Sequence, residues 1–300
     1  MIGARLECVP NVSEGRDTGR LRRLGDAVEK AGAELVDVHS DVDHHRSVFT
    51  FLGAPENVER AALAFARLAV ELIDLRRHAG VHPRIGAVDV VPFVPLAGLP
   101  MADAVTIAQR VGRALAAETG LPVFFYEEAS IVPDRRDLPE LRAGGFERLA
   151  ERLADPRWLP DAGPAAPHPS AGATVIGARR PLIALNAMLA TDDLAGARAV
   201  AAAIRERSAG GLPGVRALGV MLPSRRIAQI SMNLLDYRRT PPRAVMQRLD
   251  AETAQRGLRI TTYELVGCAP ATALDSEARS RIPDLRPTQL LAPELFQPTH

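Results

Sequence analysis

The sequence predicts a mixed α/β protein of the α+β kind, made of two domains, and three observations support this. The chain has 300 residues, about twice the length of an average domain. Short segments rich in β-branched residues alternate with longer segments in which apolar residues recur at the helical period. Residues 155–172 (DPRWLPDAGPAAPHPSAG) are dense in Pro, Gly and Ala, which predicts a long loop or linker crossing between the two halves.

In the first half, predicted strands and helices alternate. Asp17 or Thr18 can cap the first helix, Pro55 suits the first turn of the second, and Gly120 ends the third. The prolines in residues 87–95 indicate an edge strand or a strand end. The predicted strands are residues 5–9, 33–38, 47–52, 87–95 and 122–126, and the predicted helices are residues 17–31, 55–75, 102–119 and 138–153, the last broken at Gly144 and Gly145.

The second half has the order strand, helix, strand, strand, helix, strand. That order is the split βαβ or ferredoxin-like arrangement, and the first half resembles it with extra elements. The scattered prolines after residue 282 predict an irregular tail. We expect domains at residues 1–178 and 179–300. The predicted elements of the second half are residues 182–188, 192–208, 217–222, 228–234, 241–255 and 260–266.

The composition is that of a soluble globular protein, with 47% hydrophobic and 24% charged residues. A net charge of +1 argues against nucleic acid and acidic membranes as partners. No apolar run reaches the roughly 18 residues of a membrane span. The amino terminus lacks the apolar core of a signal peptide, and Cys8 and Cys268 form neither a disulfide framework nor a metal motif. We therefore expect a cytoplasmic protein with two free thiols.

One stretch, residues 75–89 (LRRHAGVHPRIGAVD), concentrates the groups that carry chemistry. His78 and His82 can exchange protons near neutral pH, and three arginines offer forked donors suited to carboxylates. Pro83 favours extended backbone at the residue before it, and Gly80 and Pro83 disfavour a helix. The pattern is typical of a binding or catalytic loop between two rigid elements.

Other chemistries find less support. The i, i+4 spacing of His78 and His82 would suit a metal only on a helix, which this stretch does not favour, and no HExxH is present. No GxSxG elbow, GxxxxGK[ST] or GxGxxG motif occurs, so we expect neither a serine hydrolase nor a nucleotide site. A histidine among arginines suggests proton transfer on an anionic small molecule. The alternative, that His82 is a structural loop histidine, stays open from the residues alone.

Six stretches in order resemble one family. They are ECVPNVSEG (7–15), LIDLRRHAGVHPRIGAVDVVPFVP (72–95), PDAGPAAPHPSAGATVIGAR (160–179), LPGVRALGV (212–220), AQISMNLLDY (228–237) and ELVG (264–267). Together they resemble the formiminotransferase family, whose members pass a formimidoyl group from N-formimidoylglutamate to tetrahydrofolate in histidine breakdown. HPRIGAVD and SMNLLD are the more specific parts, and the likeness extends to about residue 273.

The resemblance implies two ferredoxin-like α/β subdomains with a tunnel or cleft between them for a polyglutamate-tailed folate. It implies that His82, in the HPR(I/M)GA(V/L)D pattern, is the general base. Tetrahydrofolate would be a co-substrate, no metal is implied, and a homodimer is a family-based expectation. The cyclodeaminase activity of the fused animal form should be missing, because this chain ends at His300. The implied folate segment is Gly163, Pro164, Ala165, Ala166, Pro167, His168, Pro169, Ser170, Ala171 and Gly172.

Two departures from the family pattern stand out. Where the animal form has an acidic residue near the site, this chain has His39, so either another group such as Asp37 or Asp41 orients the base, or the site is tuned differently. The folate segment is poor in aromatic side chains, so pterin stacking in it would be weak or supplied elsewhere.

Both substrates of such an enzyme carry carboxylates, which arginine forks would hold. We expect Arg46 and Arg84 in that role, against the alternative of surface ion pairs. Asn11 and Ser13 precede a predicted helix amino terminus, where an anion is favoured. His39 and, more weakly, Asn233 would complete the substrate site.

The chemistry itself needs one group with a pKa near neutrality. The amine of the reduced pterin attacks the amidine carbon, and the glutamate nitrogen must be protonated to leave. His82 could move that proton without a metal or a covalent intermediate. Two alternatives remain: a related folate-dependent transferase with another donor, such as formimidoylglycine, and a folate-binding protein without catalysis.

Overall fold

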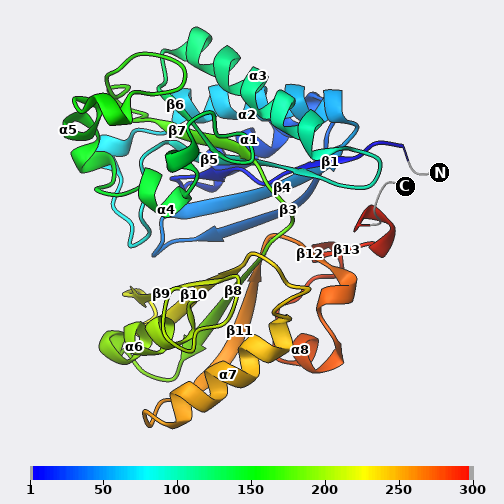
Figure 1. Cartoon of the computed structure of the whole chain (residues 1–300), viewed down its shortest axis with the longest axis vertical. Coiled ribbons are helices and arrows are strands. Elements are labelled where there is room, and N and C mark those ends of the chain that lie inside the picture. The colour runs from blue at the N-terminus through cyan, green and yellow to red at the C-terminus, as the bar shows by residue number, and fades with distance from the viewer. Residues whose placement is uncertain (1–2, 297–300) are drawn as a thin grey trace. The chain divides into compact units, whose positions relative to one another are not determined.

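The computed structural model describes residues 3–296, and the chain divides into two compact units. Unit 1 extends to Arg179, and unit 2 runs from Arg180 to Phe296. Each unit is a β-sheet with helices packed on it, which confirms the predicted α/β class (Figure 1). Within the described residues, no helix is both long and apolar enough to cross a bilayer.

The sheet of unit 1 has seven strands, in the spatial order β3, β4, then β1 and β2 in line, β5, β7, β6. The strands from β3 to β5 pair antiparallel, whereas β5, β7 and β6 are parallel. The first four positions give the ferredoxin-like order, to which β7 and β6 are added. The bounds are β1 Leu6–Cys8, β2 Asn11–Val12, β3 Glu34–Asp41, β4 Arg46–Gly53, β5 Val88–Pro95, β6 Val123–Glu127 and β7 Thr174–Ala178.

Three helices cover one face of this sheet (Figure 1). They are α1 (Thr18–Lys30), α2 (Pro55–Leu72) and α3 (Met101–Thr119). The residues predicted to begin and end these helices do so. The Asp17 side chain accepts a hydrogen bond from the Arg20 amide at the start of α1, and Pro55 lies in the first turn of α2. Gly120 adopts the left-handed conformation after α3. The core between helices and sheet includes Phe49, Phe51, Phe65, Phe93 and Phe125, all fully buried.

The predicted helix at 138–153 is two short helices, α4 (Leu138–Leu141) and α5 (Leu149–Leu153). Gly144 and Gly145 lie between them with φ of 85° and 66°, so the predicted break is real. Both helices pack on the other face of the sheet, where Phe124 and Val175 point away from α3. Residues 155–172 then lead back to β7 of unit 1, so the prediction that they cross between domains was wrong.

Strand β5 lies inside the sheet, so the first of the two predicted alternatives, an edge strand, is wrong; Pro95 does end the strand, whereas Pro92 lies within it. Pro92 has no N–H to give to the facing Val9 carbonyl, although its own oxygen accepts from the Val9 amide at 3.1 Å. The side-chain amide of Asn11 donates to the Val9 oxygen instead, at 2.9 Å. A proline is normally excluded from an inner strand because it cannot donate this hydrogen bond, and here the Asn11 side chain donates it to the Val9 oxygen.

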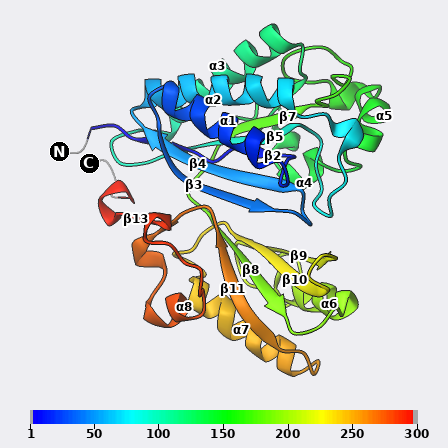
Figure 2. The same ribbon diagram turned by 180° about the vertical axis from the view of Figure 1, so that it is seen from behind.

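Unit 2 is a four-stranded antiparallel sheet in the order β11, β8, β10, β9, which is the predicted ferredoxin-like order. Two helices, α6 (Leu194–Ile204) and α7 (Pro242–Ala254), lie on one face (Figure 2). The tail is more regular than expected, because β12 (Ala269–Pro270) pairs with β13 (Leu290–Leu291) and α8 (Ser276–Ser280) lies between them in sequence. The strand bounds are β8 Ile183–Leu189, β9 Val215–Leu222, β10 Ile227–Leu234 and β11 Ile260–Val266.

Candidate active site

The loop that carries His82 joins the short 3-10 turn Leu75–Arg77 to β5, and backbone hydrogen bonds hold both of its ends. The Leu75 amide donates to the Ser170 oxygen at 2.8 Å, and the Ala87 amide donates to the Ala171 oxygen at 2.9 Å. The structure therefore brings the His82 loop and the end of the predicted folate segment side by side.

Gly86 is the point of closest approach between these two segments. A β-carbon at this position would lie 1.9 Å from the Ala173 carbonyl oxygen. We expect Gly86→Ala to push the segments apart and lower the melting temperature by several degrees, measured by circular dichroism. Gly53→Ala is the control, because a β-carbon there meets only ordinary contacts, the nearest with a Val58 methyl at 3.7 Å, and its φ is not in the left-handed region. Equal effects of the two substitutions would show that close packing at Gly86 is unimportant.

The His82 ring is partly buried and oriented by the backbone. Its Nδ1 lies 2.8 Å from the Pro83 carbonyl oxygen, and a carbonyl can only accept, so Nδ1 carries the proton and Nε2 keeps its lone pair. Within residues 3–296, Nε2 has no hydrogen-bonding partner. In the described part of the chain, neither Asp37 nor Asp41 forms a hydrogen bond with the His82 ring; Asp41 accepts from the Asp43 and His44 amides at 2.8 Å.

The surroundings of His82 keep it neutral. Burial lowers its pKa well below 6.5, and the positive charges of Arg46 and Arg142 lower it further. The ring of His44 lies 5.6 Å away at an angle of 40°. His82 is therefore an unprotonated base at neutral pH.

A buried charge cluster lies beside this ring. Arg46 Nη1 donates to Asp89 Oδ2 at 2.7 Å, and Arg142 Nη2 lies 2.5 Å from the same oxygen. The Ile85 amide donates to Asp89 Oδ1 at 2.8 Å. Burial opposes ionisation of Asp89, but the two arginines and the amide outweigh it and hold the pKa of Asp89 far below its usual value.

Among the residues predicted to bind substrate, Arg46, Asn11 and Ser13 are engaged within the protein. Asn11 Oδ1 accepts from Arg46 Nε at 3.1 Å and from Nη2 at 2.8 Å. Ser13 is buried, and its hydroxyl donates to the Gly86 oxygen at 2.7 Å. Asn11 and Ser13 thus position the Arg46 guanidinium and the His82 loop.

The other predicted substrate residues differ in their surroundings. Arg84 follows His82 closely in the loop and forms an ion pair with the exposed Glu147 at 2.8 Å. His39 lies in β3, on the sheet face opposite α1 and α2, and is partly exposed. Asn233 lies exposed in β10 of unit 2.

The predicted folate segment has an exposed beginning and a buried end. Residues 163–166 are exposed, whereas Ala171 and Gly172 are buried. The Ala171 methyl belongs to the hydrophobic core, so it is not free to touch a ligand. His168 Nδ1 accepts from the Ala171 amide at 3.1 Å, which closes the segment into a compact turn.

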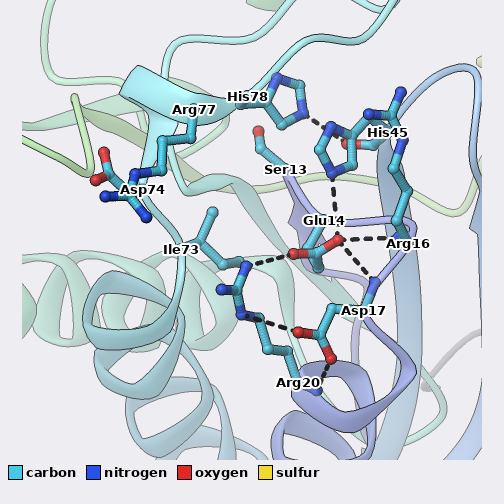
Figure 3. A pocket seen from close by; sticks show the side chains of 10 residues that line it. All are labelled: Ser13, Glu14, Arg16, Asp17, Arg20, His45, Ile73, Asp74, Arg77 and His78. Atoms are coloured by element: carbon cyan, nitrogen blue, oxygen red, sulfur yellow. Dashed lines mark hydrogen bonds and ion pairs between the residues drawn. The ribbon is translucent and has the colours of Figure 1, made fainter.

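A cavity of about 250 Å³ is lined by residues that include Ser13, Glu14, His45 and His78 (Figure 3). Glu14 lies at its centre, 2.9 Å from Arg20 and 3.2 Å from His45 Nε2. Burial opposes ionisation of Glu14, but the Arg16 and Asp17 amides and Arg20 lower its pKa to about 2. The stacked His45 and His78 rings, with centroids 4.2 Å apart, complete one wall of the cavity.

Sequence reasoning missed Asp89, Arg142 and Glu14. Asp89 ends the HPRIGAVD stretch at the start of an apolar strand, which is a readable signal for a partnered carboxylate. Nothing in the sequence around Arg142 links it to His82. Within residues 3–296, no group of three or more His, Cys, Asp or Glu side chains could hold a metal ion.

A neutral imidazole with one free ring nitrogen, beside two buried guanidiniums on a ferredoxin-like α/β scaffold, is typical of an enzyme that moves protons on an anionic small molecule. Comparison with known families identifies the particular one. Residues 5–179 match the N-terminal subdomain of the formiminotransferase domain, and residues 184–284 match the formiminotransferase domain. The chain belongs to the formiminotransferase family, as its sequence motifs predicted.

Relatives cover nearly the whole chain. It is 39% identical to a glutamate formimidoyltransferase of Streptococcus pyogenes over 270 residues, 90% of each chain. It is 41% identical to a glutamate formimidoyltransferase of Thermoplasma acidophilum over 277 residues, 91% of each chain. A formimidoyltransferase-cyclodeaminase of Gallus gallus is 43% identical over 276 residues, which are 90% of this chain and 51% of that one.

Proposed function

We propose that this protein is a glutamate formimidoyltransferase, which transfers the formimidoyl group of N-formimidoyl-L-glutamate to tetrahydrofolate and yields 5-formimidoyltetrahydrofolate and L-glutamate in histidine degradation. The observation that carries the proposal is the state of His82. Its Nδ1–H is fixed on the Pro83 carbonyl, and Nε2 keeps its lone pair, without a partner among residues 3–296. Family membership supplies the reaction that such a base would serve.

In this mechanism, a nitrogen of tetrahydrofolate attacks the amidine carbon, and His82 Nε2 takes the proton from that nitrogen. The tetrahedral intermediate collapses when the imidazolium returns the proton to the glutamate nitrogen, and the carbon–nitrogen bond to glutamate breaks. Burial and the two arginines disfavour the imidazolium, so they weaken His82 as a proton acceptor in the free protein and favour the return of the proton to the glutamate nitrogen.

Substrate binding in this proposal uses the loop and the segment that lie against it. The exposed residues 163–166 and the backbone around His168 would meet the folate, and Arg84, His39 and Asn233 would meet the substrates directly. Arg46, Asn11 and Ser13 would contribute by fixing the site. Folate polyglutamate as the natural co-substrate, a reaction without metal, a homodimeric assembly and a cytoplasmic location belong to the same proposal. Among the described residues, Cys8 and Cys268 form no disulfide, which supports a reducing compartment.

A second candidate is a folate-dependent transferase with another formimidoyl donor. His39 favours it, because the acidic residue of the animal form is replaced by a group that a different donor could need. A folate-binding protein without catalysis is less favoured, because the His82 base is preformed.

The test is an assay of the purified protein with tetrahydrofolate and either N-formimidoyl-L-glutamate or N-formimidoylglycine. Formation of 5-formimidoyltetrahydrofolate is followed together with release of the amino acid. We expect kcat/KM to be at least tenfold higher with the glutamate donor. A preference for the glycine donor would support the second candidate, and tetrahydrofolate binding without product from either donor would contradict catalysis.

A further inference from the structure

The cluster around Asp89 holds more positive than negative charge. Two guanidiniums, from Arg46 and Arg142, share the single carboxylate of Asp89, and both are about nine-tenths buried. Within the described part of the chain, neither arginine has another acidic partner. An unbalanced charge in a buried position is unfavourable unless an anion compensates it.

The two arginines differ in how many of their guanidinium nitrogens have no hydrogen-bond acceptor. Arg46 directs Nε and Nη2 to Asn11 and Nη1 to Asp89. Arg142 has a close contact to Asp89 through Nη2, but it is not aligned as a hydrogen bond, and Nε is buried without an acceptor. Arg142 is therefore the member of the cluster with unused donors.

Arg142 is held next to the His82 loop by its neighbours along the chain. It ends α4, where its own amide donates to the Leu138 oxygen at 3.0 Å. The Phe146 amide donates to the Arg84 oxygen at 2.9 Å, which ties the segment after Arg142 to the segment after His82. The guanidinium is thus fixed beside the base by two elements.

We propose that Arg142 receives a substrate carboxylate beside His82, with Asp89 and Arg46 positioning its guanidinium. The proposal rests on the proposed formimidoyl transfer and names the group that recognises the anionic substrate. The carboxylate can belong to the formimidoyl donor or to the glutamate of the folate. Nε and Nη2 of Arg142 are buried, so Nη1, which has no hydrogen-bonding partner among residues 3–296, is the donor that a carboxylate would reach.

The test compares Arg142→Met and Arg142→Lys with the wild type. The donors are N-formimidoyl-L-glutamate, N-formimidoyl-4-aminobutyrate, which lacks the α-carboxylate, and N-formimidoyl-2-aminobutyrate, which lacks the side-chain carboxylate. The acceptors are tetrahydrofolate and tetrahydropteroate, which lacks the glutamate.

We expect Arg142→Met to raise one KM about 10- to 100-fold, the usual range for a hydrogen bond to a charged group. For the substrate that lacks the carboxylate bound by Arg142, KM should be the same in the wild type and in Arg142→Met. That substrate therefore shows which carboxylate Arg142 binds. Arg142→Lys should fall between.

Stability separates this role from a structural one. Removing Arg142 leaves Asp89 and Arg46 as a balanced pair, so Arg142→Met should fold and melt close to the wild type. Arg281→Met is the matched control, since it removes an arginine paired with Asp250 in unit 2 and should leave every KM unchanged. An unchanged set of KM values for Arg142→Met, or an equal loss with all substrates together with a lower melting temperature, would overturn the proposal.

A wild type without turnover would contradict the proposed function and leave the subsite to be judged by binding. Thermal-shift titration with L-glutamate and with tetrahydrofolate serves this purpose. Stabilisation of the wild type by one of them, and its loss in Arg142→Met, supports the subsite. The same stabilisation in both proteins refutes it.

Discussion

His82→Ala will reduce kcat about 10²- to 10⁴-fold, the usual contribution of a general acid–base group. The loss follows because Nε2 of His82 takes the proton from the attacking nitrogen and returns it to the leaving one. The pKa of His82 is lowered by burial and by Arg46 and Arg142, so the ring stays neutral well below pH 6.5. We therefore expect the acid limb of kcat/KM in the wild type to lie below pH 6.5.

The controls for His82→Ala are binding and folding. The hydrogen bond of Nδ1 is to the next residue, so among residues 3–296 the ring makes no hydrogen bond to a distant element, and its neighbour from another element is the His44 ring at 5.6 Å. Tetrahydrofolate binding, measured by fluorescence titration, and the melting temperature should stay near the wild-type values. A variant with wild-type turnover and an unchanged acid limb would remove His82 from the mechanism.

Asp89→Asn will give the largest loss of stability, about 3 to 5 kcal/mol in the free energy of unfolding. The substitution leaves two buried guanidiniums without a counter-charge. Urea unfolding followed by circular dichroism measures it. Glu151→Gln is the control, because its pair with Arg148 is exposed on both sides and should leave the unfolding midpoint unchanged.

The pH dependence of this stability has a definite sign. The pKa of Asp89 is lower in the folded protein than in the unfolded chain, where it is near 3.9. The stabilisation is therefore complete above about pH 4 to 5 and is lost as the pH falls towards the folded-state value. The difference between wild type and Asp89→Asn should narrow on acidification. A difference that stayed constant down to pH 2 would mean that the charge of Asp89 is not its source.

Periodicity and end signals predicted most of the fold. The apolar faces of α1, α2 and α3, and the alternation of unit 2, follow directly from spacing along the chain. The position of β5 could not be predicted, because the rule that keeps proline at edges fails where Asn11 replaces the missing donor. The long loop at 155–172 was assigned to the wrong role because composition reveals irregular backbone but not its destination.

The site was predictable only where its residues are neighbours in sequence. His82 and Arg84 lie in one recognisable stretch, and resemblance singled out the segment that packs against it. Arg142 comes from a different part of the chain and reaches Asp89 only in the folded state. Arg46 was predicted to hold a substrate carboxylate, with a surface ion pair as the alternative, but the fold buries it between Asn11 and Asp89. Burial of a charged side chain depends on tertiary contacts that spacing does not encode.

The proline in β5 has a consequence for how rigid the catalytic centre is. Since Asn11 must turn its amide towards the Val9 carbonyl, its oxygen has only one direction left, and Arg46 occupies it. The backbone of the sheet therefore determines the orientation of the Arg46 guanidinium, because Asn11 is fixed by the Val9 carbonyl. The hydrogen bond that Pro92 cannot donate is thus replaced by one from Asn11, and the same side chain holds the Arg46 charge in place near the His82 ring.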